Sequence, residues 1–217
     1  MTVAPCRRAA IYSLVTIVLL VSPAYARAAE LLPCALRLGT SFNLAEVIHV
    51  GGTEPTAQLL STVGVDAGWR ASGTTIVFAE GAIGGSSFDF DGLGFAGRIH
   101  NQTWRAATGI RQELGRSPSL ELHLSVGGAY TEVSSWAQND AGRHTGPLNR
   151  VAGAFVGFGG SAGFCKNLRV FGELTQSAGY GSANDPALHA HYEWFYRGIQ
   201  TAIGLEWNRE IAKAASK

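Results

Sequence analysis

The segment SLELHLSVGGAY, residues 119–130, alternates aliphatic and polar side chains at every second position. One phase carries three leucines and a valine, and the other carries Glu121, His123 and Ser125. A repeat of two residues is that of a β-strand, in which successive side chains point to opposite faces. The same repeat recurs along the chain, and we expect eight strands, at residues 35–44, 62–71, 74–86, 93–112, 119–136, 149–164, 168–180 and 192–207.

The segments between the expected strands alternate between long and short. Residues 45–61 and the stretch AQNDAGRHTGPL are long links, whereas Ser72-Gly73 and CKN are short ones. Such alternation is typical of an antiparallel barrel with tight turns at one end and loops at the other. The sequence therefore predicts an all-β fold, an antiparallel up-and-down eight-stranded barrel.

Alternation alone does not tell which face of the barrel points inward. A soluble lipocalin-like barrel has its apolar face inside, and a membrane barrel has that face outside. The chain has only three lysines, all in an expected turn or the C-terminal tail, so the polar face is poorly suited to solvent. We favour a transmembrane β-barrel whose lumen holds a polar network of ten ionisable groups: Arg37, Asp66, Arg70, Arg98, His100, Glu121, His123, Arg169, Glu173 and Glu206.

The positions of the aromatic residues also favour a membrane barrel. An aromatic cluster lies at residues 192–196, at the loop-side start of the last expected strand, and Trp69 and Trp207 fall at turn-side ends. Aromatic rings favour the bilayer interface, where an apolar body and a polar tip are both satisfied. The alternative is that these rings are ordinary core residues.

Two expected strands do not alternate cleanly. In residues 74–86, Glu80 shares a face with Ile76 and Phe78, which predicts either a bulge or a less polar lumen face. In residues 93–112, alternation is kept only if the phase slips near Asn101.

The N-terminus has the order of a secretory signal peptide. Two arginines precede an apolar run from Ile11 to Ser22, and Ala24-Tyr25-Ala26 is a small-x-small cleavage site. The run of 12 residues is shorter than the ~20 that a transmembrane helix needs. We expect a signal peptide at residues 1–26, export, and a single barrel domain at residues 27–217 with a short C-terminal tail.

Composition and motifs exclude several classes of function. Removal of residues 1–26 leaves 191 residues with 15 basic and 16 acidic side chains, a net charge of −1. The arginines are scattered, so we expect no nucleic-acid surface. No nucleotide-binding loop, serine-centred elbow or metalloprotease helix motif occurs, so the sequence predicts no cofactor and no catalytic or metal site. An enzyme remains an open alternative.

These features resemble the small eight-stranded outer-membrane β-barrel proteins of Gram-negative bacteria. The resemblance covers nearly all of the mature chain and rests on pattern and segment lengths. It implies location in the outer membrane, both termini in the periplasm, four surface loops, and contact with outer-membrane lipid and the barrel-assembly machinery. The implied roles are structural, adhesive through an extracellular ligand of the loops, or those of a narrow pore. Family members usually end on an aromatic residue, whereas here Trp207 is followed by NREIAKAASK.

Loss of the signal peptide removes Cys6 and leaves Cys34 and Cys165. In an oxidising compartment an even pair of cysteines predicts a disulfide. The barrel topology puts both cysteines at the periplasmic end, two strand spacings or roughly 10 Å apart, a gap that the N-terminal segment must cross. The alternative is two isolated thiols that pack as small hydrophobes.

Two further candidate sites stay open. Lipid A deacylase-like barrels also resemble this chain and carry a His-x-Ser pair with a nearby acid. Ser177 matches the serine and Glu193 offers the acid, but Thr175 stands where the histidine belongs. In the segment HAHYE, the alternating His189, His191 and Glu193 are candidate metal ligands, with a polar loop segment as the alternative.

Overall fold

The computed structural model divides the chain into two compact units, Met1–Pro33 and Cys34–Lys217, and all strands belong to the second. The expected signal peptide and the tail beyond Arg209 lie outside the described residues. Among the residues that are described, no helix is long and apolar enough to cross a membrane. The structure describes residues 32–49, 56–92, 95–117, 119–139, 142–165, 167–185 and 190–209.

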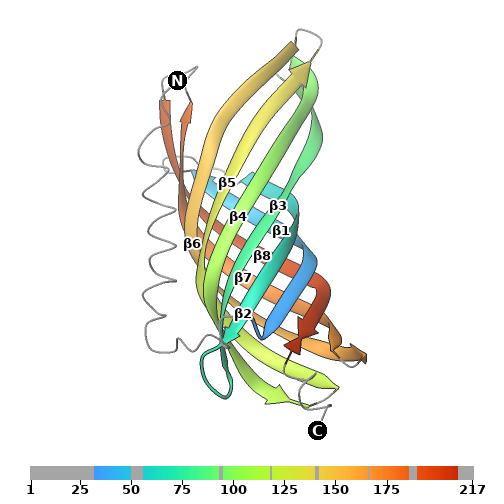
Figure 1. Cartoon of the computed structure of the whole chain (residues 1–217). Coiled ribbons are helices and arrows are strands. Elements are labelled where there is room, and N and C mark those ends of the chain that lie inside the picture. Colours follow the sequence, from blue (N-terminus) through green and yellow to red (C-terminus); the bar gives the residue numbers. More distant parts are fainter. Residues whose placement is uncertain are drawn as a thin grey trace. The chain divides into compact units, whose positions relative to one another are not determined.

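The second unit is a closed β-barrel (Figure 1). The strands pair in chain order as antiparallel neighbours, and the first also pairs with the last. The predicted eight-stranded up-and-down barrel is confirmed. Its strands are β1 (Ala35–His49), β2 (Thr56–Arg70), β3 (Thr75–Gly92), β4 (Phe95–Arg116), β5 (Leu120–Asn139), β6 (Gly142–Cys165), β7 (Leu168–Asp185) and β8 (Ala190–Asn208).

Most strands that reach further than predicted do so at one end of the barrel. At the terminal end, where β1 begins and β8 ends, the predicted and observed bounds agree within one residue, except that β4 continues to Arg116 where the sequence predicted an end at residue 112. At the opposite, distal end, β6 begins at Gly142 where the sequence predicted residue 149. In the distal segments the hydrogen-bonded ladder continues, but the outward face is polar. These segments therefore lack the apolar alternation from which the rest of each strand was predicted.

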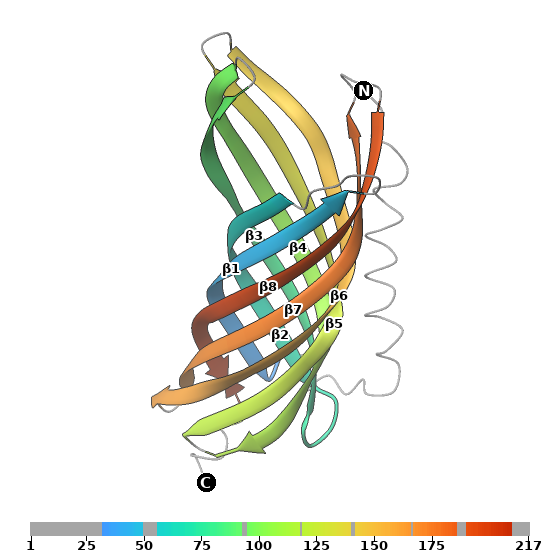
Figure 2. The ribbon, with the colours of Figure 1, turned by 180° about the vertical axis from the view of Figure 1, so that it is seen from behind.

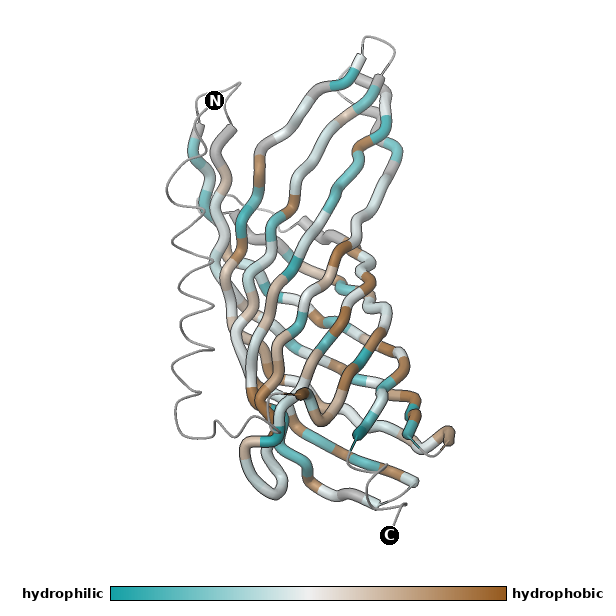
Figure 3. Tube along the Cα trace, in the orientation of Figure 1, coloured by the Kyte–Doolittle hydropathy of each residue, from teal (hydrophilic) through white to brown (hydrophobic). Residues whose placement is uncertain are grey.

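The outer surface of the barrel carries a belt of exposed apolar side chains. Leu38, Val65 and Leu124 belong to the outward phase and are 56%, 53% and 43% exposed. Figure 3 shows hydrophobic residues concentrated in the part of the barrel nearest the terminal end. An apolar surface of this extent is stable against lipid and unstable in water. A lipocalin-like barrel has the opposite arrangement, so that alternative is wrong.

Two ion pairs mark the distal edge of this belt. Among the described side chains, the outward face bears no charge between the terminal end and the level of Glu46, Glu132, Arg150 and Arg197. Glu46 pairs with Arg197, and Glu132 Oε2 lies 3.4 Å from Arg150 Nε. The outward face therefore changes from apolar to charged at this level.

Strand β3 has no bulge where it pairs with β2. Its register with β2 is continuous from Ser61 opposite Gly85 to Arg70 opposite Ile76. Of the two sequence interpretations, the one with a less polar lumen face is therefore the one observed: Ile76 and Phe78 are buried inside the barrel.

The fourth strand also keeps one phase. Its register with β5 is continuous from Arg98 to Glu113, and the irregularity lies between Glu113 and Gly115. The predicted slip near Asn101 is therefore wrong. Odd-numbered residues of β4 point inward along this length, and even-numbered residues point outward.

Strands β2 and β3 separate toward the distal end. Their pairing ends at Ser61 and Gly85, although β2 pairs with β1 as far as Thr56 and β3 pairs with β4 as far as Gly92. Figure 2 shows β1 and β2 ending well short of the distal ends of β4 and β5. The barrel wall is therefore lower on the side of β1 and β2.

Two glycines lie where the separation begins. A Cβ atom on Gly84 would lie 1.9 Å from the carbonyl oxygen of Ser61, and one on Gly85 would lie 2.1 Å from that of Asn101. Neither distance is compatible with a side chain. The bend of β3 away from β2 therefore depends on close approach of the backbone to both neighbouring strands.

Candidate functional site in the barrel interior

Glu173 of β7 lies at the centre of a cluster of charged side chains inside the barrel. Its Oε2 atom lies 3.3 Å from Arg37 Nη1 and 4.0 Å from Arg111 Nη2. Ser125 Oγ donates a hydrogen bond to Oε1 at 2.5 Å, and His123 Nε2 lies 3.4 Å from Oε2. Side chains from β1, β4 and β5 thus converge on one carboxylate of β7.

Two more carboxylates balance the two arginines of this cluster. Arg37 Nε donates a hydrogen bond to Glu206 Oε2 at 2.7 Å, and Arg111 Nη2 donates one to Asp66 Oδ2 at 2.6 Å. Arg37 and Arg111 are 3% and 2% exposed. An unpaired guanidinium in such a place would keep its full desolvation cost, so the carboxylates stabilise the buried charges.

Phenylalanine rings pack against the charged cluster. Arg37 Cζ lies 4.9 Å from the ring centroid of Phe171, and Arg111 Cζ lies 4.7 Å from that of Phe78. The ring centroids of Phe78 and Phe155 are 6.2 Å apart. Guanidinium groups are attracted to aromatic faces, and this attraction is larger where water is excluded. Rings and charges from several strands therefore pack against one another in the interior.

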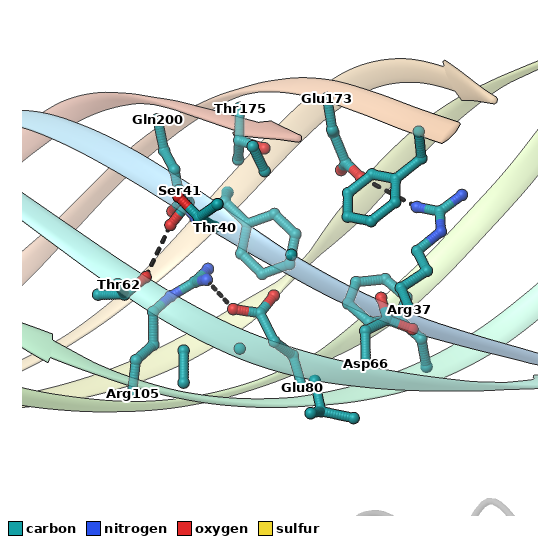
Figure 4. A pocket seen from close by; sticks show the side chains of 18 of the residues that line it. Arg37, Thr40, Ser41, Thr62, Asp66, Glu80, Arg105, Glu173, Thr175 and Gln200 are labelled. Atoms are coloured by element: carbon teal, nitrogen blue, oxygen red, sulfur yellow. Dashed lines mark hydrogen bonds and ion pairs between the residues drawn. The ribbon is translucent and has the colours of Figure 1, made fainter. Parts of the chain in front are cut away.

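A small cavity lies on the distal side of Glu173. Its lining includes the Glu80–Arg105 ion pair and the hydroxyls of Ser41 and Thr62, which are 2.7 Å apart (Figure 4). The cavity volume is about 60 Å³. A cavity of this volume is large enough to hold water.

Polar contacts also fill the interior near the terminal end. Arg169 Nε donates to Ser161 Oγ at 2.8 Å, and Arg169 Nη2 donates to the Ser161 carbonyl at 2.9 Å. Arg70 Nη2 lies 2.7 Å from Glu113 Oε1, and Glu121 is 1% exposed. The interior is therefore polar and packed from the cavity to this end.

The structure brings together most of the predicted lumen residues. Arg70 lies at the rim of the terminal end, in contact with Glu113. Seven of the ten predicted residues lie in the interior, all of them buried except Glu173, whose side chain is 12% exposed: Arg37, Asp66, Glu121, His123, Arg169, Glu173 and Glu206.

Arg98 and His100 do not belong to the lumen. The Arg98 side chain is 58% exposed and pairs with Asp89 at 2.7 Å, and the His100 ring stacks on Trp136. Both residues have even numbers in β4 and therefore point outward. They lie in the distal extension, where the outer face is itself polar, so polarity there does not identify the lumen side.

Four lumen residues of β3 and β4 were not predicted from the sequence: Glu80, Arg105, Arg111 and Glu113. The signal was present in the segment TWRAATGIRQE, where every second residue from Thr103 to Glu113 is small or charged. This signal was overlooked because Arg98, an even-numbered residue, was predicted to point inward, which assigns the opposite phase to the strand.

The two described cysteines, Cys34 and Cys165, are not bonded to each other. Cys34 is buried, and its Sγ lies 3.3 Å from the carbonyl oxygen of Gly68 in β2. Cys165 is exposed at the end of β6. The predicted disulfide is not formed, because β7 and β8 lie between β6 and β1, and Cys34 already packs on the other side of β1 against β2.

The residues of the deacylase-like alternative do not meet. Ser177 points inward, with its Oγ 3.0 Å from Tyr196 Oη, and Thr175 is also buried inside. Glu193 points outward near the distal end, where a hydrogen bond from Tyr180 lowers the pKa of its carboxyl group. A serine and an acid on opposite faces of the wall cannot share one proton-transfer chain.

The candidate metal ligands are only partly described. His189 lies outside the described residues. His191 Nε2 lies 3.4 Å from Glu193 Oε1, and both side chains are exposed. Within the described ranges, no group of three or more histidine, cysteine or acidic side chains is placed to hold a metal ion.

Comparison with known proteins identifies the architecture. No protein-family model and no curated protein sequence matches the chain. The outer membrane protein OprG of Pseudomonas aeruginosa is similar in structure with a TM-score of 0.57 at 12% identity, and the match covers 80% of this chain and 93% of OprG. Ail, the attachment invasion locus protein of Yersinia pestis, matches with a TM-score of 0.44 at 8% identity over 81% of this chain and 100% of Ail. The chain thus has the transmembrane barrel fold of the small outer-membrane β-barrel proteins.

Proposed function

We propose that this protein is an outer-membrane barrel that is closed to solutes and acts through the part of its sheet that stands outside the membrane. The closed state of the barrel is supported by the cluster around Glu173, where charged groups and phenylalanine rings from different strands meet in the interior. An eight-stranded barrel has an interior just wide enough for side chains, so such a cluster leaves no room for a solute path.

The size of the interior cavity supports a closed barrel. Its volume of about 60 Å³ is large enough for water but small for a channel that passes sugars or amino acids. Arg37 and Arg111 are held by three carboxylates, so opening a path requires the separation of buried ion pairs. That separation is costly because each charge would lose its partner in a medium of low polarity.

The lengths of the strands support a role outside the membrane. Strands β4, β5 and β6 have 22, 20 and 24 residues. A tilted strand needs about 9–11 residues to cross a bilayer, so roughly half of each strand extends beyond it. We assign this extension, at the distal end, to the cell exterior, with a structural or adhesive role toward an extracellular ligand.

Location in the outer membrane follows from the fold and from the expected signal peptide at residues 1–26. The partners that this location requires are outer-membrane lipid around the apolar belt and the barrel-assembly machinery. The terminal end, with Ala35 and Asn208, would then face the periplasm.

The test is ion conductance of the purified full-length protein in planar lipid bilayers. We expect no steady current from the unaltered protein. Phe155→Ala removes a lumen ring, whereas Phe158→Ala removes an outward ring that is 51% exposed, so only the first should raise leakage. A steady, narrow conductance of the unaltered protein would overturn the proposal and favour a narrow pore.

A further inference from the structure

The outer face of the distal sheet carries an ordered patch of aromatic and cationic side chains. The strand registers place His100, Trp136 and Thr145 side by side on β4, β5 and β6, and place Gln138 beside Arg143 one row further out. The His100 and Trp136 rings are stacked, with centroids 5.3 Å apart and an angle of 14° between their planes. Arg143 Cζ lies 4.5 Å from the Trp136 ring centroid. We call His100, Trp136 and Arg143 the outer patch.

Because of an irregularity in β6, the Arg143 side chain points to the outer face. Below it, even-numbered residues of β6 such as Arg150 point outward. Between Ser134 and Trp136 the β5–β6 register shifts by one residue, at Gly146 and Pro147 of β6. An extra residue in one strand reverses the inward and outward phase beyond it, so the odd-numbered Arg143 points outward. Proline is tolerated at such a position because the ladder is already interrupted.

Arg143 differs in charge balance from the other arginines of this face. Arg98 is compensated by Asp89, whose pKa is lowered by the hydrogen bond from Arg98, so both groups are charged and cancel. Arg150 is compensated by Glu132. In the part of the chain that the structure describes, Arg143 has no carboxylate within ion-pair distance. Stacking on Trp136 holds its guanidinium in place with N–H donors available.

The outer patch continues the lipid-facing surface. Trp104 of β4 lies in the same row as Glu132 and Arg150, two outward-facing rows nearer the terminal end than Trp136. Its ring centroid is 5.2 Å from that of Tyr130. These two rings lie at the distal edge of the apolar belt, where aromatic side chains meet lipid headgroups. A lipid against this wall would therefore have its headgroup at Trp104 and Arg150, and any larger headgroup would reach the outer patch.

We propose that the outer patch binds the phosphorylated saccharide headgroup of a glycolipid in the outer leaflet, with Arg143 as the phosphate ligand. Guanidinium groups bind phosphate through paired N–H donors, and a stacked arginine loses little freedom on binding. Arg143 lies beyond the row of Arg150 by about 20 Å along the tilted strand, counted as six residues of β5 at ~3.3 Å each, so the ligand is a headgroup of several sugar units. The inference rests on the proposed location of the distal end outside the cell.

The test compares purified lipopolysaccharide with the same material after enzymatic dephosphorylation, bound to the refolded full-length protein in detergent micelles. We expect the phosphorylated form to bind at least about tenfold tighter, the usual effect of a charge-assisted contact. Arg143→Gln should remove most of this preference, and Trp136→Ala should reduce it because the guanidinium loses its support. Arg98→Gln, on the same face but compensated by Asp89, is the matched control and should leave the preference intact.

Equal binding of the two lipid forms, or an unchanged preference in Arg143→Gln, would overturn the inference. Each variant is also checked for the heat-dependent gel shift of a folded barrel, and Arg143→Gln alone suffices if Trp136→Ala does not fold. Conductance separates the two proposals. If the protein prefers the phosphorylated lipid but conducts ions, the lipid-binding inference stands and the closed-barrel proposal is wrong. If it conducts no ions and shows no preference, the closed-barrel proposal stands and the lipid-binding inference is wrong.

Discussion

Arg37 Nε and Glu206 Oε2 lie 2.7 Å apart at the seam where β1 and β8 close the barrel. The two residues also face each other in the strand register, and neither is more than 3% exposed. Arg37 reaches Glu173 on β7 as well, so one guanidinium ties together the first strand and the last two. The polar interior is therefore part of what holds the seam closed.

Glu206→Gln should lower the free energy of unfolding by about 1.5–3 kcal/mol, because Arg37 loses one of its two buried carboxylate partners and keeps only Glu173. The measurement is the temperature or urea concentration at which the folded band disappears in unheated gel samples. Glu46→Gln breaks an ion pair on the outer face, where Arg197 is 67% exposed, and serves as the control. If Glu206→Gln were as stable as this control, the seam would not depend on the interior charges.

Gly84→Ala should destabilise the barrel by about 1–3 kcal/mol, as overpacking generally does. The added methyl group would lie 1.9 Å from the Ser61 carbonyl oxygen, so β2 and β3 would have to move apart. Gly81→Ala is the matched control, since a Cβ there meets no atom within 4 Å. Equal unfolding midpoints for the two variants would contradict the close approach at Gly84.

The two cysteines should differ in reactivity. In the folded protein, a polar maleimide should label Cys165, which is exposed, and should spare Cys34, which is buried against β2. After denaturation both should react. Mass spectrometry of intact protein counts the labels. Absence of any label until a reductant is added would instead establish the disulfide predicted from the sequence.

The mature protein should begin at Arg27. Cleavage after Ala26 removes the basic and apolar segments and leaves 191 residues. The intact mass of protein isolated from outer-membrane fractions tests this directly. A full-length mass in that fraction would show that the apolar segment is retained.

The sequence was sufficient to predict the part of the barrel that contacts lipid. There, the period of two couples an apolar outside to a polar or small inside, and residues such as Leu38, Val65 and Glu121 lie on the expected faces. Outside the bilayer both faces are polar, so the same signal vanishes. This is why the distal extensions, and the outward positions of Arg98 and His100, were not predicted.

The interior required knowledge of the register. Glu80 follows Ile76 and Phe78 on one face, which read as a break in the pattern because a lumen was expected to be polar throughout. In the folded barrel the rings pack under arginines from other strands, so an apolar residue inside is satisfied. The outward position of Arg143 depends on one extra residue in β6, which periodicity alone does not reveal.

The separation of β2 from β3 limits how deeply the barrel is immersed. Beyond Ser61 and Gly85, one edge of each strand lacks a partner among the described strand pairings. Backbone groups without partners are excluded from hydrocarbon, where no water can replace the lost hydrogen bonds. On this side the hydrocarbon layer must therefore stop near Ser61, which faces Phe42 of β1, four residues before Glu46 appears on the outer face. A thicker membrane could not be accommodated by sinking the barrel, and would have to thin around β2 and β3.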